Sequence, residues 1–366
     1  GARVTSARGV LGRVPSSAWL AVATAGVVVL FLFGVQLLGA ATGAATPALR
    51  SVLESLVVGD ASALGLGWLG AYGLANGSVV AALALSLFDA DLVTQPQLFL
   101  LVAGSRLGAA AIVVFVGALD FFQRERFSLR ESTSLGLLAF LLTHSVYLPV
   151  AALGYVSLPA LTDSVAGVSR SAAGGGGALS VFEGLTTAVT DALGPMPSVL
   201  LAVAVLFGSL RLFDRVLGRV DTDVLRDRLF RRLERTWLSF GIGLLVTVAT
   251  TSVAFSLGVV VPLYNRGYVE RDELVPYTLG ANVGTLVDTL VVAVVLGAPA
   301  GVATVLVLLA LATAVTLALL VVHDPYADAV ATVHDRLLDD RRAFAGFVVA
   351  LVLVPLGLVL VPLALG

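Results

Sequence analysis

Long apolar runs dominate the pattern of hydrophobic and polar positions along this chain. About 20 predominantly apolar residues are enough to carry a helix across the hydrocarbon core of a bilayer. Runs of this kind predict seven membrane spans, at residues 19–41, 97–121, 134–157, 196–213, 275–297, 301–323 and 343–365. The pattern therefore predicts an all-α polytopic membrane protein.

Two further apolar stretches, 62–87 and 237–262, are broken near their centres. Glycines crowd the first stretch, and the polar run Thr250-Thr251-Ser252 interrupts the second. Each stretch could cross the membrane once, or it could enter and leave on the same side as a re-entrant hairpin. Their length and composition alone are compatible with both.

The distribution of arginine separates these two alternatives, because positively charged loops accumulate on the cytoplasmic side. If both stretches are re-entrant, 19 of the 22 basic residues, all of them arginine, fall on one side of the membrane. If both stretches cross, only 9 arginines remain on that side. We therefore predict seven spans and two re-entrant helical hairpins, with a cytoplasmic N-terminal segment at residues 1–18. The first hairpin then enters from outside and the second from the cytoplasm.

The two halves of the chain carry matching sequence landmarks at a constant interval. VAGSRLGAA begins at Val102, and the similar run TLGANVGTL begins at Thr278. The same interval separates the breaks of the two hairpins, at Ala75 and Thr251. A repeated sequence with opposite placement of its hairpins is the inverted-topology arrangement of many secondary transporters, in which the substrate lies near the membrane midplane.

The repeat sets the expected domain organisation. The first repeat covers 19–157 and the second covers 196–323. An outer glycine-rich loop and a short helix at 158–195 separate them. A cytoplasmic loop at 324–342 leads to the C-terminal span at 343–366. Two inverted-topology repeats with about seven spans and two hairpins are thus the predicted fold.

Composition narrows the function. Hydrophobic residues make up 58% of the chain and charged residues only 13%, against about a quarter charged in soluble domains. The net charge of −2 provides no general attraction to nucleic acid. The absence of cysteine excludes disulfides and thiolate metal sites. No zinc-protease, phosphate-loop or nucleophile-elbow motif occurs, so we expect neither an enzyme nor a cofactor.

Several of these landmarks resemble the type II sodium–phosphate cotransporter family. LFLFGVQLLG at 30–39, followed by an amphipathic segment, is similar to that family's opening. GANVGT at 280–285 resembles the family signature that follows a hairpin, and GSRLGA at 104–109 is a degraded copy of it. The resemblance implies a multi-pass protein of the plasma membrane that couples uptake of inorganic phosphate to Na+. Its ligands would come from the two hairpin tips and from the spans that follow them.

The chain departs from this family at the hairpin tips, which read QSSS in both repeats of the family. The matching positions here are ANGS at 75–78 and TSVA at 251–254. Fewer side-chain oxygens therefore remain to coordinate a hard cation or to hold phosphate. This departure bears on the substrate, and the expected cargo is inorganic phosphate or a related oxyanion.

The resemblance and the repeat together define the candidate binding residues. They are polar side chains of the two tips and the adjoining spans, namely Asn76, Ser78, Arg106, Thr247, Thr250, Thr251, Ser252, Asn282, Thr285, Asp288 and Thr289. Na+ is expected at Thr251, Ser252, Asn282 and Thr285. Thr247, Thr285 and Thr289 could instead simply bond back to their own helices.

Arg106 stands where the second repeat has Asn282, deep in its span. A charge at that depth costs roughly 2.5–3.5 kcal/mol on insertion scales, so it should face a cavity or a partner. Arg106 could hold an oxyanion or replace a bound cation, or it could simply pair with Asp288. Asp288 could otherwise bind Na+ or carry a proton. His144 could relay a proton, or bond to a neighbouring carbonyl group.

The leading hypothesis is a sodium-coupled symporter of inorganic phosphate or a related oxyanion that works by alternating access. Its expected partners are the oxyanion, Na+, the lipid bilayer and, in a homo-oligomer, further copies of the chain; nucleic acid is not expected. One alternative is a proton-coupled or channel-like permease of the same fold with a different substrate. Another is a non-transporting membrane scaffold.

Overall fold

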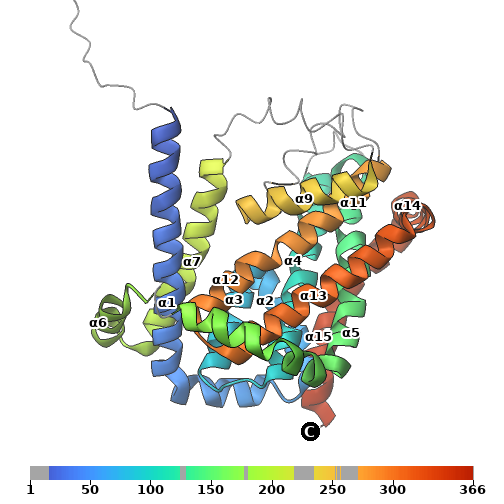
Figure 1. Ribbon diagram of the computed structural model, residues 1–366. Coiled ribbons are helices and arrows are strands. Elements are labelled where there is room, and N and C mark those ends of the chain that lie inside the picture. Colours follow the sequence, from blue (N-terminus) through green and yellow to red (C-terminus); the bar gives the residue numbers. More distant parts are fainter. Residues whose placement is uncertain are drawn as a thin grey trace, which may run out of the picture.

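The computed structural model describes residues 16–123, 129–176, 180–217, 235–251, 253, 256 and 271–365 (Figure 1). Within these ranges every regular element is a helix. The helices are α1 (Ser16–Leu56), α2 (Asp60–Leu74), α3 (Gly77–Asp89), α4 (Gln95–Gln123), α5 (Leu129–Gly176), α6 (Glu183–Leu193), α7 (Pro195–Leu217), α9 (Thr236–Thr250), α11 (Arg271–Gly284), α12 (Leu286–Leu296), α13 (Pro299–Val321), α14 (His323–Asp339) and α15 (Arg341–Leu365).

Seven helical segments in the described part of the chain are long and apolar enough to span a membrane. They are Trp19–Leu56, Gln95–Phe115, Thr133–Gly176, Pro195–Leu217, Asp272–Leu296, Pro299–Val321 and Arg341–Ala364. Each contains all or most of one expected span, so the predicted all-α protein with seven spans is confirmed in helix length and composition. Helix α1 begins at the top of Figure 1 and the chain ends at the bottom, as an odd number of crossings requires.

Helix α5 overturns part of the expected outer loop. The sequence predicts a glycine-rich loop from residue 158 onwards, but the helix continues to Gly176 through Pro149 and Pro159. Gly176 approaches α12 so closely that a Cβ atom would lie 2.1 Å from the carbonyl oxygen of Val294. Gly176 therefore ends α5 in close contact with α12, because only a residue without a side chain fits at that position. The short helix expected after them is α6.

The expected loop at 324–342 is also largely helical, since α14 occupies most of it. The buried residues of α14 are Ala327, Val330, His334 and Leu338, which recur every three or four positions. Such spacing gives one narrow buried stripe, and this stripe packs α14 against α5 and α15. The expectation of a loop was wrong because the polar outer face of this helix dominates its sequence. Its cytoplasmic location stays a prediction.

Close helix packing joins the first hairpin to the helix that follows it. A Cβ atom on Gly67 of α2 would lie 2.2 Å from the carbonyl oxygen of Leu101 in α4. A Cβ atom on Gly104 of α4 would lie 2.2 Å from the carbonyl oxygen of Leu64 in α2. Small residues on facing helices let the two backbones touch in this way. The two helices therefore behave as one packed unit.

The same packing recurs in the second half of the chain, between α9 and α11. A Cβ atom on Gly243 would lie 2.1 Å from the carbonyl oxygen of Tyr277, and one on Gly280 would lie 2.1 Å from that of Phe240. The second-half residues in these contacts correspond one by one to the first-half residues. The pairs are Gly67 and Gly243, Leu101 and Tyr277, Gly104 and Gly280, and Leu64 and Phe240, and each pair is separated by the interval between the two hairpin breaks. The repeated glycines of the sequence are thus helix-packing positions in both halves.

The hairpin breaks correspond in backbone conformation as well. Ala75 follows α2 and Thr251 follows α9, and both residues adopt a left-handed conformation with φ of 49°. A left-handed residue stops a helix because the backbone can no longer continue its hydrogen-bond pattern. Helices α2 and α9 each have 15 residues, and their first residues are separated by the same interval as the breaks. Most of the second arm of the second hairpin lies outside the described residues.

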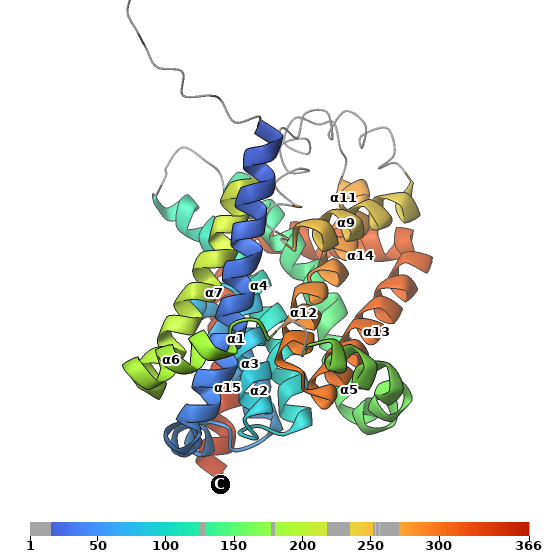
Figure 2. The same cartoon turned by 60° about the vertical axis from the view of Figure 1, so that its left-hand side comes forward.

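The first hairpin and α9, the described arm of the second hairpin, lie toward opposite ends of the molecule (Figures 1 and 2). Helices α2 and α3 lie in the lower half of both views, whereas α9 lies near the top beside α11. Helices α1 and α7 pack against each other along one side of the bundle. This arrangement leaves the hairpin breaks, α4, α5 and α7 to meet in the interior.

Candidate functional site

A cavity of about 250 Å³ lies where the two halves of the chain meet. Its walls come from both hairpin breaks and from α4, α5, α7 and α11. The lining residues are Asn76, Gly77, Ser78, Arg106, Ala109, Ala110, Val113, Ala139, Thr143, Tyr147, Leu210, Phe213, Asp214, Thr251, Val253, Thr278, Asn282 and Thr285. The structure therefore brings together six predicted site residues: Asn76, Ser78, Arg106, Thr251, Asn282 and Thr285.

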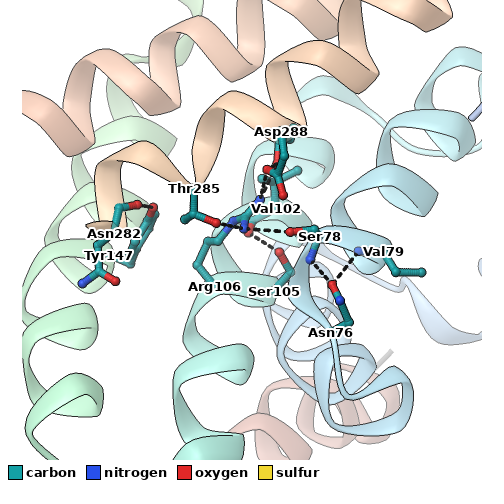
Figure 3. Close-up of polar contacts among 11 residues, drawn as sticks. Asn76, Ser78, Val79, Val102, Ser105, Arg106, Tyr147, Asn282, Thr285 and Asp288 are labelled. Atoms are coloured by element: carbon teal, nitrogen blue, oxygen red, sulfur yellow. Dashed lines mark hydrogen bonds and ion pairs between the residues drawn. The ribbon is translucent and has the colours of Figure 1, made fainter. Parts of the chain in front are cut away.

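The guanidinium group of Arg106 lies between the two halves (Figure 3). Its Nη1 atom donates to the hydroxyl of Ser78 at 3.4 Å and to that of Thr285 at 3.1 Å. Its Nη2 atom lies 3.4 Å from Oδ1 of Asp288 and also donates to the hydroxyl of Thr289. One side chain of α4 thus contacts the first hairpin and the broken span of the second half, in which α11 ends at Gly284 and α12 begins at Leu286.

Arg106 and Asp288 are buried, with 5% and 3% of their surface exposed. A buried charge without a partner is expensive, so this ion pair accounts for how both side chains are tolerated at depth. The pairing considered in the sequence analysis is therefore present. It does not use every polar atom, because Nε of Arg106 and Oδ2 of Asp288 have no hydrogen-bond partner among the described residues.

Asn282, the counterpart of Arg106, has a different environment. Its Oδ1 atom lies 3.2 Å from the Thr143 hydroxyl, and its backbone carbonyl accepts from the Tyr147 hydroxyl at 2.9 Å (Figure 3). The Thr143 hydroxyl also lies 2.8 Å from the carbonyl oxygen of Ala139. The Thr143 hydroxyl has a single proton, which it can donate either to Asn282 or to the Ala139 carbonyl. The side-chain amide of Asn282 can therefore present either its oxygen or its nitrogen to this hydroxyl. In both orientations one polar atom of the amide keeps no partner in the described structure.

Asn76 has a structural role at the first tip. Its Oδ1 atom accepts from the backbone nitrogens of Ser78 and Val79, at 2.9 and 3.1 Å. Asparagine is a preferred residue for this position, because its side chain satisfies the free N–H groups at a helix start. The cap begins α3 at the cavity and orients the Ser78 hydroxyl toward Arg106 (Figure 3).

The second tip is only partly described. Thr251 lines the cavity with a left-handed backbone, which is unusual for a β-branched residue. Thr250 donates to the carbonyl of Val246 in its own helix at 2.7 Å. Thr247 is buried, and its hydroxyl has no partner among the described residues. Ser252, expected as a ligand of Na+, lies outside the described residues.

Asp288 and Thr289 lie beside the cavity but do not line it. Asp288 instead lines a second cavity of about 310 Å³, mainly apolar, between α1, α7, α9 and α12. Thr251, Leu210 and Phe213 line both cavities, so the two are neighbours. The Arg106–Asp288 pair therefore lies at the boundary between a polar and an apolar space.

Four polar residues of the polar cavity were not among the predicted ones: Thr143, Tyr147, Asp214 and Thr278. The first two lie within LLTHSVYLP of α5, in which His144 was the predicted candidate. The Nδ1 atom of His144 lies 3.0 Å from the Phe140 carbonyl, and its ring stacks on Phe140. His144 does not line the cavity, so the carbonyl-bonded alternative describes it. A one-turn shift along the same helix would have found Tyr147.

A model of the Na+/Pi-cotransporter family matches residues 205–360. This match starts in α7 and ends in α15, so it includes the second hairpin, α11 and the broken span. No curated protein and no solved structure matches the chain. The family match and the seven apolar helices support a transporter of the membrane. Together they support the membership of this chain in the Na+/Pi-cotransporter family, as the resemblance in its sequence predicted.

Proposed function

We propose that this protein is a sodium-coupled symporter of inorganic phosphate or a related oxyanion, with its substrate site in the polar cavity. The observation that carries the proposal is the buried guanidinium of Arg106 in the wall of a cavity built from both halves. A guanidinium matches the geometry of phosphate and similar oxyanions with paired N–H donors. The Nε atom of Arg106 has no hydrogen-bond partner among the described residues.

The cavity also contains groups suited to a cation. Thr251, Asn282 and Thr285 contribute hydroxyl and amide oxygens, which are appropriate ligands for Na+. Asp214 adds a carboxylate to the same wall. A site with donors for an anion and oxygens for a cation is what coupled binding of the two requires, because each ion offsets the charge of the other.

Alternating access around this cavity is supported by the repeat. The two hairpin breaks share their backbone conformation and the interval of the other landmarks, and the first hairpin and α9 lie toward opposite ends of the molecule. Inverted repeats with broken helices at the midplane permit one half to rock against the other around a fixed site. We propose that the two halves are such repeats, in a plasma-membrane protein with a cytoplasmic N-terminus.

Uptake into proteoliposomes tests the proposal. We expect radiolabelled phosphate to accumulate when an inward Na+ gradient is imposed and not when choline replaces Na+. Unlabelled arsenate and sulfate should be added as competitors, because they report which oxyanion fits. Empty liposomes are the control for leak.

The alternatives give different results in the same assay. Accumulation that follows an imposed pH gradient and ignores Na+ would indicate the proton-coupled permease. Equilibration without accumulation would indicate a channel-like permease. Absence of any uptake, for every oxyanion tried, would contradict transport and favour a scaffold.

A further inference from the structure

Four side-chain oxygens enclose the end of Arg106. They belong to Ser78, Thr285, Asp288 and Thr289, and each is within hydrogen-bond or ion-pair reach of Nη1 or Nη2. The Thr289 hydroxyl also donates to Oδ1 of Asp288 at 3.0 Å. The group around the guanidinium is therefore three hydroxyls and one carboxylate, drawn from both halves of the chain.

Such a group has the composition of a site for a hard monovalent cation. Carboxylate and hydroxyl oxygens are the ligands that hard cations prefer, and nitrogen and sulfur atoms are absent from this set. Its formal charge of −1 matches one positive charge. In this protein that positive charge is covalently attached, because arginine stays protonated at any working pH.

We propose that Arg106 is a tethered cation: its guanidinium fills an oxygen cage formed by Ser78, Thr285, Asp288 and Thr289 that would otherwise bind Na+. The proposal deepens the proposed function, since it concerns the number of Na+ ions that the same site takes from solution. A tethered charge neutralises Asp288 in every state of the cycle and never leaves with the substrate. The protein therefore needs one Na+ fewer than a chain with an open cage.

Shortening the side chain should open the cage. Arg106→Asn places at this position the residue that the second half has at Asn282, and it removes the positive charge while adding an amide oxygen. Asp288 is then left without its partner, and a buried carboxylate strongly favours the binding of a cation. Arg106→Lys is the matched control, because its ammonium group keeps a tethered positive charge near Asp288.

Equilibrium binding of radiolabelled Na+ to the purified protein in detergent tests this directly. We expect Arg106→Asn to bind one more Na+ per chain than the native protein and to be more thermostable in Na+ than in choline. Arg106→Lys should bind no additional Na+. The double variant Arg106→Asn with Asp288→Asn should lose the additional site, because the carboxylate that holds the ion is gone.

Each outcome decides between a tethered cation and an ordinary ion pair. Unchanged Na+ binding in folded Arg106→Asn, or additional binding that persists without Asp288, would overturn the proposal. Failure of both Arg106→Asn and Arg106→Ala to fold in Na+ would also overturn it, since bound Na+ should replace the lost charge. The assay needs no phosphate and no transport, so a negative uptake experiment would leave its result standing.

Discussion

At the residue scale, the ion pair of Arg106 and Asp288 joins α4 of the first half to α12 of the second. The two residues are far apart in the sequence, and both are buried. Removing one partner of a buried pair leaves an uncompensated charge, whereas removing both leaves only neutral groups. Loss of one partner of this pair should therefore lower the stability of the protein more than loss of any other contact in the site. Single and double substitutions can distinguish the cost of a stranded charge from the loss of the pair itself.

We expect Asp288→Asn to lower the free energy of unfolding by about 3–5 kcal/mol, the usual cost of stranding a buried charge. The double variant Arg106→Gln with Asp288→Asn should recover much of this loss, because no charge remains to be stranded. Unfolding in mixed micelles of mild and denaturing detergent, with choline as the only bulk cation, measures both. If the loss in the double variant equalled the sum of the losses in Asp288→Asn and Arg106→Gln alone, the two groups would not interact.

The cap at the first tip provides a second prediction at this scale. Asn76→Ala should destabilise the protein by about 1 kcal/mol, because the N–H groups of Ser78 and Val79 lose their acceptor. Asn76→Ser is the control, since serine caps helices nearly as well. Thermal unfolding compares the three proteins. If serine were as damaging as alanine, Asn76 would have a role in binding rather than in capping.

At the scale of elements, helix pairs α2–α4 and α9–α11 are held by glycines that admit the backbone of the partner. The corresponding positions in the two halves meet equivalent carbonyl groups, as the contacts of Gly67 and Gly243 show. Sequence similarity between the halves is low at the hairpin tips and higher at these positions. Packing between a hairpin and the next helix is therefore the feature that the two halves share most closely.

Gly243→Ala should destabilise the protein by about 1–3 kcal/mol, the usual cost of overpacking, because its Cβ would lie 2.1 Å from the Tyr277 carbonyl oxygen. Gly241→Ala is the matched control in the same helix, since its Cβ would meet no described atom within 4 Å. That control should be neutral or slightly stabilising, because alanine favours helix. Unfolding in mixed micelles distinguishes them, and equal effects would contradict the packing.

At the scale of the whole molecule, we predict that the two hairpins enter the membrane from opposite faces. Helices α2 and α3 have 15 and 13 residues, fewer than the roughly 20 that a span requires. Helix α9 also has 15 residues. These lengths favour hairpins that enter and return, and the positions of α2, α3 and α9 in Figure 1 favour opposite faces.

Cysteine labelling can test this topology, because the chain has no native cysteine. Glu54 and Asp89 flank the first hairpin and are exposed, as are Arg235, which precedes the second hairpin, and Arg336. We expect Glu54→Cys and Asp89→Cys to react with an impermeant maleimide from outside intact cells. Arg235→Cys and Arg336→Cys should react only after permeabilisation. Labelling of Glu54→Cys and Asp89→Cys from opposite sides would mean that the first hairpin crosses completely.

The sequence by itself determined the seven spans, the resemblance to the cotransporter family and the positions of the repeated landmarks. Span length follows from bilayer thickness, and the glycines of 102–110 and 278–286 report a local packing rule, so both can be predicted without a structure. The hairpin tips and Asn282 were found in the same way, from their common interval. The arrangement of the two halves as inverted repeats remains a prediction.

Only the tertiary structure decided which side chains meet. Tyr147 and Asp214 reach the cavity from α5 and α7, and nothing in their local sequence distinguishes them from His144, which lies outside it. Helix α14, in the expected loop at 324–342, is stabilised by a narrow, mainly apolar stripe that is buried only because α5 and α15 pack against it. The cage around Arg106 combines oxygens from segments far apart in the chain, and contacts of that kind have no local signature because folding alone brings them together.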